Sequence, residues 1–570
     1  MRSLFICLSF LTALGLGAQD LQNLTNRQAA QVSGSLQFGM QFYRAEGLPS
    51  RANPFQVTAN GNLNIQLLEE FNIPISWAIG RQRPNIRGPV FSQFGLSPRY
   101  KSLTVHAGYR NLNFGRFTLN NHTFLGGGVE VQSGKLRLAG MYGRLRQGVR
   151  EVSEDIDLFT RQPLYNRMAW GGRIGFGTDE SHFDITYFRA EDRDLNLDAD
   201  QLDSLDLPPP AENIVLGIDF KQRIGQNFNL FLEAAGSGFN RNLNSEELPI
   251  NEAPVSSLIE PLFTARFSNQ AGLAIRGGFK YRLRAFNIGA EYERIDPGFE
   301  SMGTYFLNGD WENYRINSGF GLFRNRVRLQ GSLGIQRNNL YEQRLETNRR
   351  VIGAGNLLWQ GGDNWGLSMQ YSNFSQDQRP SALIVLNDTL RIASTTENIG
   401  GSWYLSTSSS DGASGNWLVT LNLQRTDNDN PLNEGFTQIN TLFSTLGYTH
   451  RFPNQKTQLS GNVNFNRIEL AIQPTSSYGI TLGVQHQLAE DKLRLSASNT
   501  FNRNLVNGEA DGLSNVLRAN MTWSLNEIHQ LTAGFSWLER NSDLGFGFRE
   551  QRLQIGYGMR FRPKRKSEEE

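Results

Sequence analysis

Hydrophobic and polar residues alternate through most of the chain. In the C-terminal segment, Leu553, Ile555, Tyr557, Met559 and Phe561 alternate with charged, amide or glycine residues. Because successive side chains of a strand point to opposite faces, this pattern predicts a strand with one apolar and one polar face. We count about 25 such runs of roughly 10 to 14 residues, and no convincing run with a helical period. The chain is therefore predicted to be all-β.

The connections between these runs indicate a membrane barrel. A tilted strand needs about 9–11 residues to cross a bilayer, whereas strands of soluble sandwiches are usually about five or six residues long. Short polar turns such as 178–181 and 453–455 alternate with long loops such as 191–210 and 239–261. Transmembrane barrels have short periplasmic turns and long extracellular loops. We therefore expect a single large antiparallel transmembrane β-barrel with both termini on the periplasmic side.

The number of strands follows from the same alternation. It holds from about residue 168 to 561 but is lost between 55 and 123, where the connections 80–99 and 111–121 are both long. One of them is expected to contain a short strand or to fold inward. Since an even number is required, we predict about 24 strands, within a range of roughly 22 to 26. Residues 81–124 are our candidate for an element folded into the lumen, and an ordinary surface loop is the alternative.

The N-terminus predicts export. Arg2, the apolar stretch 4–16 and the small residues that end at Ala18 have the order of a secretory signal peptide. The only cysteine, Cys7, lies inside it, so the exported chain would have no disulfide and no thiolate metal ligand. We predict a cleaved signal peptide (1–18), a short periplasmic segment (19–31), the barrel (32–562) and a charged periplasmic tail (563–570). The segment 19–31 is too short for the plug of a TonB-dependent transporter.

Composition narrows the class further. The chain has 56 basic and 54 acidic residues, a balance that argues against a nucleic-acid partner. A mean hydropathy of −0.44, with no long apolar run after the N-terminus, excludes a helical membrane protein. The expected partners are outer-membrane lipid, the barrel-assembly machinery during biogenesis, and possible protein subunits of an outer-membrane complex.

Charged residues recur on the face predicted to line the lumen. They are Arg276, Lys280, Arg282, Arg284, Glu291, Glu293, Arg315, Arg326 and Arg328. Inward charges are expected in a water-filled barrel, and cross-strand pairs of opposite sign stabilise it by about 0.2–1 kcal/mol each. We interpret the set as a charge ladder that keeps the lumen hydrated and the wall rigid. The alternative is a basic stripe that selects anionic solutes, which the near-zero net charge does not favour.

Histidines and aromatic residues near the turns predict a membrane-interface belt. Its members are His450, His486, His529, Trp537 and Phe561. Elsewhere, His106 shares its face with Ser102 and Thr104, and His182 shares its face with Asp184. Alternate residues of a strand are about 7 Å apart, too far for a direct bond between a nucleophile and its base. We therefore expect no enzyme.

Two motifs superficially suggest ligand sites. Oxygen ligands alternate at Asp194, Asn196, Asp198 and Asp200, as in calcium loops, but the glycine and the acidic twelfth ligand of such a loop are missing. A solvated acidic extracellular loop is the better interpretation. The glycines 126–128 are not followed by the lysine and helix of a phosphate-binding loop. No metal and no cofactor are predicted.

Several segments resemble known proteins. The residues Gln554, Gly556, Met559 and Phe561 resemble the terminal-strand assembly signal of outer-membrane barrels, although a charged tail follows them here. The body resembles a Bacteroidota-type family of porin-like outer-membrane barrels that lack a TonB-dependent plug. The likeness lies in NPFQVTANGNLNIQ, FSQFGLSPRYKSLTVHAGYRNLNF, TFLGGGVEV, ERIDPGFESMGTYFLNGDWEN and YSNFSQDQRP. This resemblance implies location in the cell outer membrane and supplies no activity.

Two functions fit these features. The first is a porin-like channel for small hydrophilic solutes. The alternative is an occluded structural or accessory barrel that acts as a subunit of a larger secretion, assembly or uptake complex. A lumen as wide as the strand count predicts would harm the cell if it were open, which favours occlusion, but nothing in the sequence specifies a partner.

Overall fold

The structure is a computed structural model that describes residues 30–68, 70–80, 93–148, 165–195, 209–248, 263–305, 307, 309–344, 346–380, 392–428, 438–470, 473–545 and 547–561. The predicted signal peptide, the charged tail and the first part of the predicted inward element (81–92) lie outside these residues. The described residues contain strands and connections but no helix, and so no helix long and apolar enough to cross a membrane.

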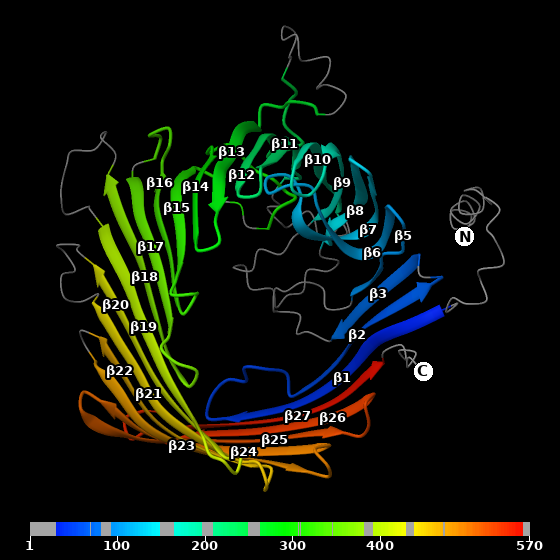
Figure 1. Ribbon diagram of the computed structural model, residues 1–570. Helices are drawn as coiled ribbons and strands as arrows, with labels where there is room; N and C mark the ends of the chain where they lie inside the picture. Colours follow the sequence, from blue (N-terminus) through cyan, green and yellow to red (C-terminus); the bar gives the residue numbers. More distant parts are fainter. Residues whose placement is uncertain are drawn as a thin grey trace.

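The strands follow one another around a single sheet (Figure 1). They are β1 (Ala30–Glu46), β2 (Phe55–Leu67), β3 (Phe71–Gly80), β4 (Gln93–Leu96), β5 (Arg99–Tyr100), β6 (Leu103–Asn113), β7 (Asn120–Ser133), β8 (Leu136–Arg146), β9 (Tyr165–Gly177), β10 (His182–Leu195), β11 (Glu212–Ile224), β12 (Phe228–Asn240), β13 (Asn269–Arg282), β14 (Phe286–Ile295), β15 (Trp311–Leu322), β16 (Val327–Asn338), β17 (Glu346–Gln360), β18 (Trp365–Pro380), β19 (Ile392–Ser408), β20 (Ser414–Asn428), β21 (Ile439–Phe452), β22 (Thr457–Leu470), β23 (Thr475–Leu488), β24 (Leu493–Val506), β25 (Glu509–Ser524), β26 (His529–Arg540) and β27 (Phe548–Phe561).

The sheet closes into a barrel. All pairings are antiparallel between neighbours in sequence, and β1 pairs with β27 from Gly34↔Phe561 to Glu46↔Arg549. Strands β4 and β5 both lie between β3 and β6, so they share one position in the wall. The 27 strands therefore form a closed barrel of 26 positions. This closure confirms the predicted antiparallel barrel and its even strand number.

The predicted strand count of about 24 lies two below the observed number. The interrupted position β4/β5 lies at the end of the connection 80–99, one of the two in which a short strand or an inward fold was expected. Its two pieces are four and two residues long, too short to show a period-two pattern. With this strand in place, long and short connections alternate from β1 to β22; beyond β22, the connections 471–474 and 507–508 on the long-loop side are as short as the periplasmic turns.

The wall has an apolar outer face and a polar inner face. Exposed large side chains such as Ile174, Leu273 and Leu482 lie on the outer face, and aromatic pairs such as Trp417 and Tyr448 contact each other across strands there. The residues that alternate with them along each strand, on the inner face, are mostly amides, hydroxyls, glycines and charged residues. This is the arrangement of a transmembrane barrel with a hydrated lumen.

The buried apolar core lies inside the barrel. Two connections from the long-loop side turn into the lumen: residues 114–119 between β6 and β7, and, between β14 and β15, the described residues of 296–310, which leave out 306 and 308. We call them the first and second inward segments. Phe117 and Phe299 are almost fully buried, as are Phe188 and Val215 on the wall that they cover. An inward fold was expected within 81–124, and residues 114–119 fold inward whereas residues 93–113 belong to the wall.

Candidate functional site: the lumen wall

The two inward segments bind each other through their backbones. Asn120 N donates to Gly303 O at 3.0 Å, and the Ser301 hydroxyl donates to Thr118 O at 2.7 Å. The close approach requires glycine at position 303, because a Cβ there would lie 2.2 Å from Thr118 O. The two segments therefore form one layer inside the barrel.

Asn213 of β11 connects this layer to the wall. Its side chain is fully buried; it donates to Glu300 O at 3.0 Å and accepts from Met302 N at 2.9 Å. The Ser237 hydroxyl of β12 also donates to Glu300 O. Buried backbone groups of a loop need such partners, because an unpaired buried donor or acceptor costs about 1–3 kcal/mol. The second inward segment is thus fixed against β11 and β12.

An ionic network holds the first inward segment. Arg116 donates through Nε to Glu293 Oε1 at 2.5 Å and through its backbone N to Glu233. Arg276 makes a two-point bond to Glu291 at 3.0 and 3.1 Å and stands beside Glu233 and Glu293 in the strand register. Alternating acidic and basic groups therefore neutralise one another on β12 to β14.

The residues predicted to line the lumen are distributed over this region. The strand register puts Arg276, Lys280, Arg282, Glu291, Glu293, Arg315 and Arg328 on the inner face, whereas Arg284 and Arg326 lie in short turns. Arg276 and Lys280 both lie over the Phe231 ring, at 5.2 and 5.7 Å from its centre. Within this set the structure brings together Arg276, Glu291 and Glu293. Arg328 lies on β16, two strands away from Glu291 and Glu293 on β14.

Among the residues of the predicted belt and of the assembly signal, His450, His486, His529, Met559 and Phe561 lie near the periplasmic ends of their strands, whereas Trp537 lies near the opposite end of β26. His450, His486, His529, Trp537, Met559 and Phe561 have the outward register, whereas Gln554 and Gly556 face inward. Each of the three histidines accepts or donates one bond through Nδ1, from His450 to Tyr448, from His486 to Thr457 and from His529 to Tyr557.

The structure reveals one histidine contact that the sequence did not show. The Ser97 hydroxyl lies 2.9 Å from His106 Nδ1, and His106 Nε2 lies 3.2 Å from Glu130. Ser97 comes from the interruption between β4 and β5, not from the face of His106 that was considered in the sequence. The Ser97 backbone N–H donates to Pro74 O and is not free to bind an oxyanion. We interpret the chain of bonds as a tie between the interrupted strand position and β6.

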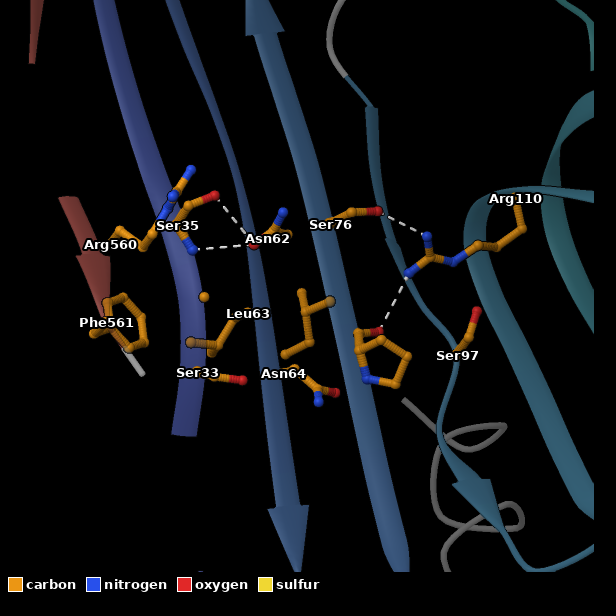
Figure 2. A pocket seen from close by; sticks show the side chains of 13 residues that line it. Ser33, Ser35, Asn62, Leu63, Asn64, Ser76, Ser97, Arg110, Arg560 and Phe561 are labelled. Carbon is orange, nitrogen blue, oxygen red and sulfur yellow. Dashed lines mark hydrogen bonds between the residues drawn. The ribbon is translucent and has the colours of Figure 1, made fainter. Parts of the chain in front are cut away.

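A hollow of about 550 Å³ lies beside this tie, where the first and last strands meet (Figure 2). Arg110 reaches from β6 and donates to the Ser76 hydroxyl at 2.7 Å and to Pro74 O at 3.4 Å. On the other side, Ser35 donates to Asn62 Oδ1 through both its backbone N and its hydroxyl. These polar side chains are mostly bonded to one another, so the hollow presents few free groups to a ligand.

His182, Asp184 and Asp219 form the one group of three potential metal ligands found among the described residues. Asp184 already accepts two bonds from Arg137 Nε at 3.1 and 3.2 Å, and His182 Nε2 lies 3.4 Å from Asp219. Arg137 and Arg173 both lie within ion-pair distance of Asp184, so this carboxylate already has positively charged partners. The calcium-like residues 194–200 lie outside the residues whose side chains are described.

A second hollow, of about 600 Å³, lies on a part of the wall that has no charged lining residues. The side chains with inward register that line it are all uncharged: Asn287, Asn317, Gln330, Ser332, Asn356, Gln370, Ser372 and Asn398. The lumen therefore has a charged part, on β7 to β15, covered by the inward segments. It also has a neutral part on β18 to β23, where Arg451 is the single charged residue with inward register among the described residues.

Comparison with known proteins adds little to this geometry. No family model matches, and no curated protein matches. Among solved structures, the P pilus usher PapC translocation pore is 11% identical over 93% of this chain and 99% of its own, with a TM-score of 0.38. The FrpB iron transporter of Neisseria meningitidis (F5-1 variant) is 11% identical over 92% and 82%, with a TM-score of 0.37. OccAB1 of Acinetobacter baumannii is 10% identical over 60% and 91%, with a TM-score of 0.32. Likeness at this level says nothing about the solutes or partners of this chain.

Proposed function

We propose that the protein is an outer-membrane channel for small hydrophilic solutes. The observation that carries the proposal is the inner face of the wall from β16 to β27. There, among the described residues, polar side chains face the lumen and nearly all of them stay in contact with solvent; Thr441 and Asp511 are the buried polar exceptions. A closed wall with a lipid-facing outer side and an accessible polar inner side supports diffusion of hydrated solutes.

The charge pairs limit selectivity in this channel. Within the basic stripe considered as an alternative, Arg276 is paired with Glu291, whereas Lys280, Arg282, Arg315 and Arg328 make no ion pair among the described residues; the chain as a whole is nearly neutral, with 56 basic and 54 acidic residues. We therefore expect weak discrimination between cations and anions.

A second function is favoured by one observation. The inward segments fill part of the lumen with tightly packed apolar side chains, including Phe117 and Phe299. An occluded barrel that serves as a subunit of a larger outer-membrane complex would use such packing.

Single-channel conductance in a planar bilayer distinguishes the two functions. We expect purified, refolded barrel to give steady, ohmic openings with a reversal potential near zero in a salt gradient. A barrel that keeps the heat resistance of a folded β-barrel but never conducts would contradict the channel. Isolation of the protein from native membranes with its bound subunits would then be the next experiment.

A further inference from the structure

The solvent-exposed large apolar side chains of the inner face are concentrated in one place. The exposed ones with inward register in the described strands are Phe374, Tyr404, Leu418, Ile439, Phe443 and Leu470, and all lie on β18 to β22. Phe443 is 43% exposed, Leu418 45%, Phe374 39% and Tyr404 38%. Each of these side chains leaves apolar surface in contact with water, and a gathering of such surface marks a candidate binding site. We call these six residues the apolar track.

The register arranges the apolar track in three cross-strand rows. Phe374, Ile439 and Leu470 share the row nearest the extracellular side, through Thr396 and Thr426. Phe443 lies four residues further along β21, and the directly paired Tyr404 and Leu418 lie four residues further again. Four residues of a strand span about 13 Å, so the three rows cover about 26 Å of the wall. The track thus extends across most of the membrane.

Uncharged hydrogen-bonding groups separate and flank these rows. Phe443 stands between Asn422 and Asn466, its direct partners on β20 and β22. Between the rows lie Ser372, Asn398, Gln424, Thr441, Ser368, Ser402, Thr420, Thr445 and Asn464, with Ile468 as the one apolar side chain among them. In the described parts of β18 to β23, Arg451 near the periplasmic end is the single charged residue with inward register. The 600 Å³ hollow continues this neutral surface through Gln370 and Asn398.

Each solute class meets this surface differently. An anion or a cation would leave water without gaining an ion pair. A long apolar chain would cross polar rows between rings about 13 Å apart and leave their amides unpaired. An uncharged sugar has apolar C–H faces that stack on an aromatic ring and hydroxyls at its edge that donate and accept. Amides and hydroxyls match those edge groups, because both can donate and accept.

We propose that β18 to β22 form a binding track for uncharged oligosaccharides, with Phe443 as its central ring and Asn422 and Asn466 as its hydrogen-bonding partners. This inference rests on the proposed channel function and names its substrate class. A sugar moves between the three rows by exchanging one ring contact for the next, and the flanking amides replace its water.

Calorimetric titration of the folded, detergent-solubilised barrel tests the track without requiring conduction. The probes are the uncharged hexasaccharides maltohexaose and cellohexaose, with hexagalacturonate as the charged comparison. We expect at least one uncharged probe to bind and hexagalacturonate to bind more weakly. Because an aromatic stacking contact contributes about 0.5–1.5 kcal/mol, Phe443→Ala should weaken binding roughly 2- to 12-fold.

Phe231→Ala is the matched control. Phe231 is also an inward-facing ring, but it lies on β12 beneath Arg276 and Lys280, so its loss should leave the affinity unchanged. Heat resistance on electrophoresis verifies that each variant folds. No binding of either uncharged probe, tighter binding of hexagalacturonate, or equal affinity in Phe443→Ala and the wild type would overturn the track. A barrel that binds sugar but does not conduct would refute the channel and leave the binding track supported. A barrel that conducts but does not bind sugar would refute the binding track and leave the channel supported.

Discussion

The strongest structural prediction concerns Asn213, which joins the second inward segment to the wall. Its side chain donates to Glu300 O and accepts from Met302 N, and the residue has no exposed surface. Asn213→Ala removes both contacts, together with the bonds that the same amide donates to Gly238 O at 3.0 Å and to the Ser237 hydroxyl at 3.3 Å, and places no new group in the layer. The barrel itself should still form, because its strand ladder does not use this side chain.

The free-energy cost of Asn213→Ala follows from the buried backbone groups that lose their hydrogen-bond partner. Met302 N would become a buried donor without a partner, at about 1–3 kcal/mol, and the lost bond to Glu300 O adds about 1 kcal/mol. Glu300 O keeps the Ser237 hydroxyl, which limits that second contribution. The inward segment should therefore be destabilised by about 2–4 kcal/mol, equivalent to a roughly 30- to 1000-fold larger opening equilibrium.

Hydrogen–deuterium exchange measures this opening. Peptides covering 297–305 and 117–120 should exchange faster in Asn213→Ala, since Asn120 N is bonded to Gly303 O across the layer. Exchange in β20 to β25 should not change. Asn60→Ala is the control, because this inward-facing amide of β2 makes one exposed bond to Gln37 and does not touch the segments. Unchanged exchange in both peptides would refute the assigned anchoring role.

Three further predictions concern the same part of the barrel. Gly303→Val should separate the two inward segments, because even a Cβ at 303 would lie 2.2 Å from a carbonyl of the first segment; single-channel recordings should show larger or noisier openings than those of wild type. Arg116→Met should lower the thermal stability more than Glu293→Gln, because Glu293, at 2% side-chain exposure, would remain buried and unpaired, at about 3–5 kcal/mol; equal melting temperatures would contradict this. Asp179 lies in a turn outside the strands, and the hydrogen bond from Arg137 lowers the pKa of its carboxyl group. The ionised carboxylate therefore stabilises the fold above the unfolded pKa, and this stabilisation is lost as pH falls through the lower folded pKa. Acid unfolding of Asp179→Asn should therefore differ from that of wild type at neutral pH and converge with it below about pH 3.

The wall of the barrel was predictable because its pattern is local. The alternation in 553–561 gives the apolar face of β27 directly, since strand side chains alternate whatever the neighbouring strand is. Even the short strand β4/β5 could be suspected from the sequence, because the connections 80–99 and 111–121 are both long where the alternation of long and short connections calls for one of them to be short.

The contents of the lumen depend on contacts between distant residues. Nothing near Phe117 indicates that it meets Phe299, and nothing near Asn213 indicates a bond to Met302. Ser97 reaches His106 through an irregular connection that a period-two pattern cannot describe. Phe443 could have been noticed in the sequence, because it is a large apolar residue at a strand position where the alternation predicts a polar one.

The account rests on a lumen that conducts, and planar-bilayer recording of the refolded wild-type barrel tests this directly. We predict stepwise, ohmic currents with little preference between cations and anions, carried past the paired charges of β12 to β14 and along the neutral wall. Heat-resistant, correctly folded barrel that gives no current steps at any voltage would contradict the central claim.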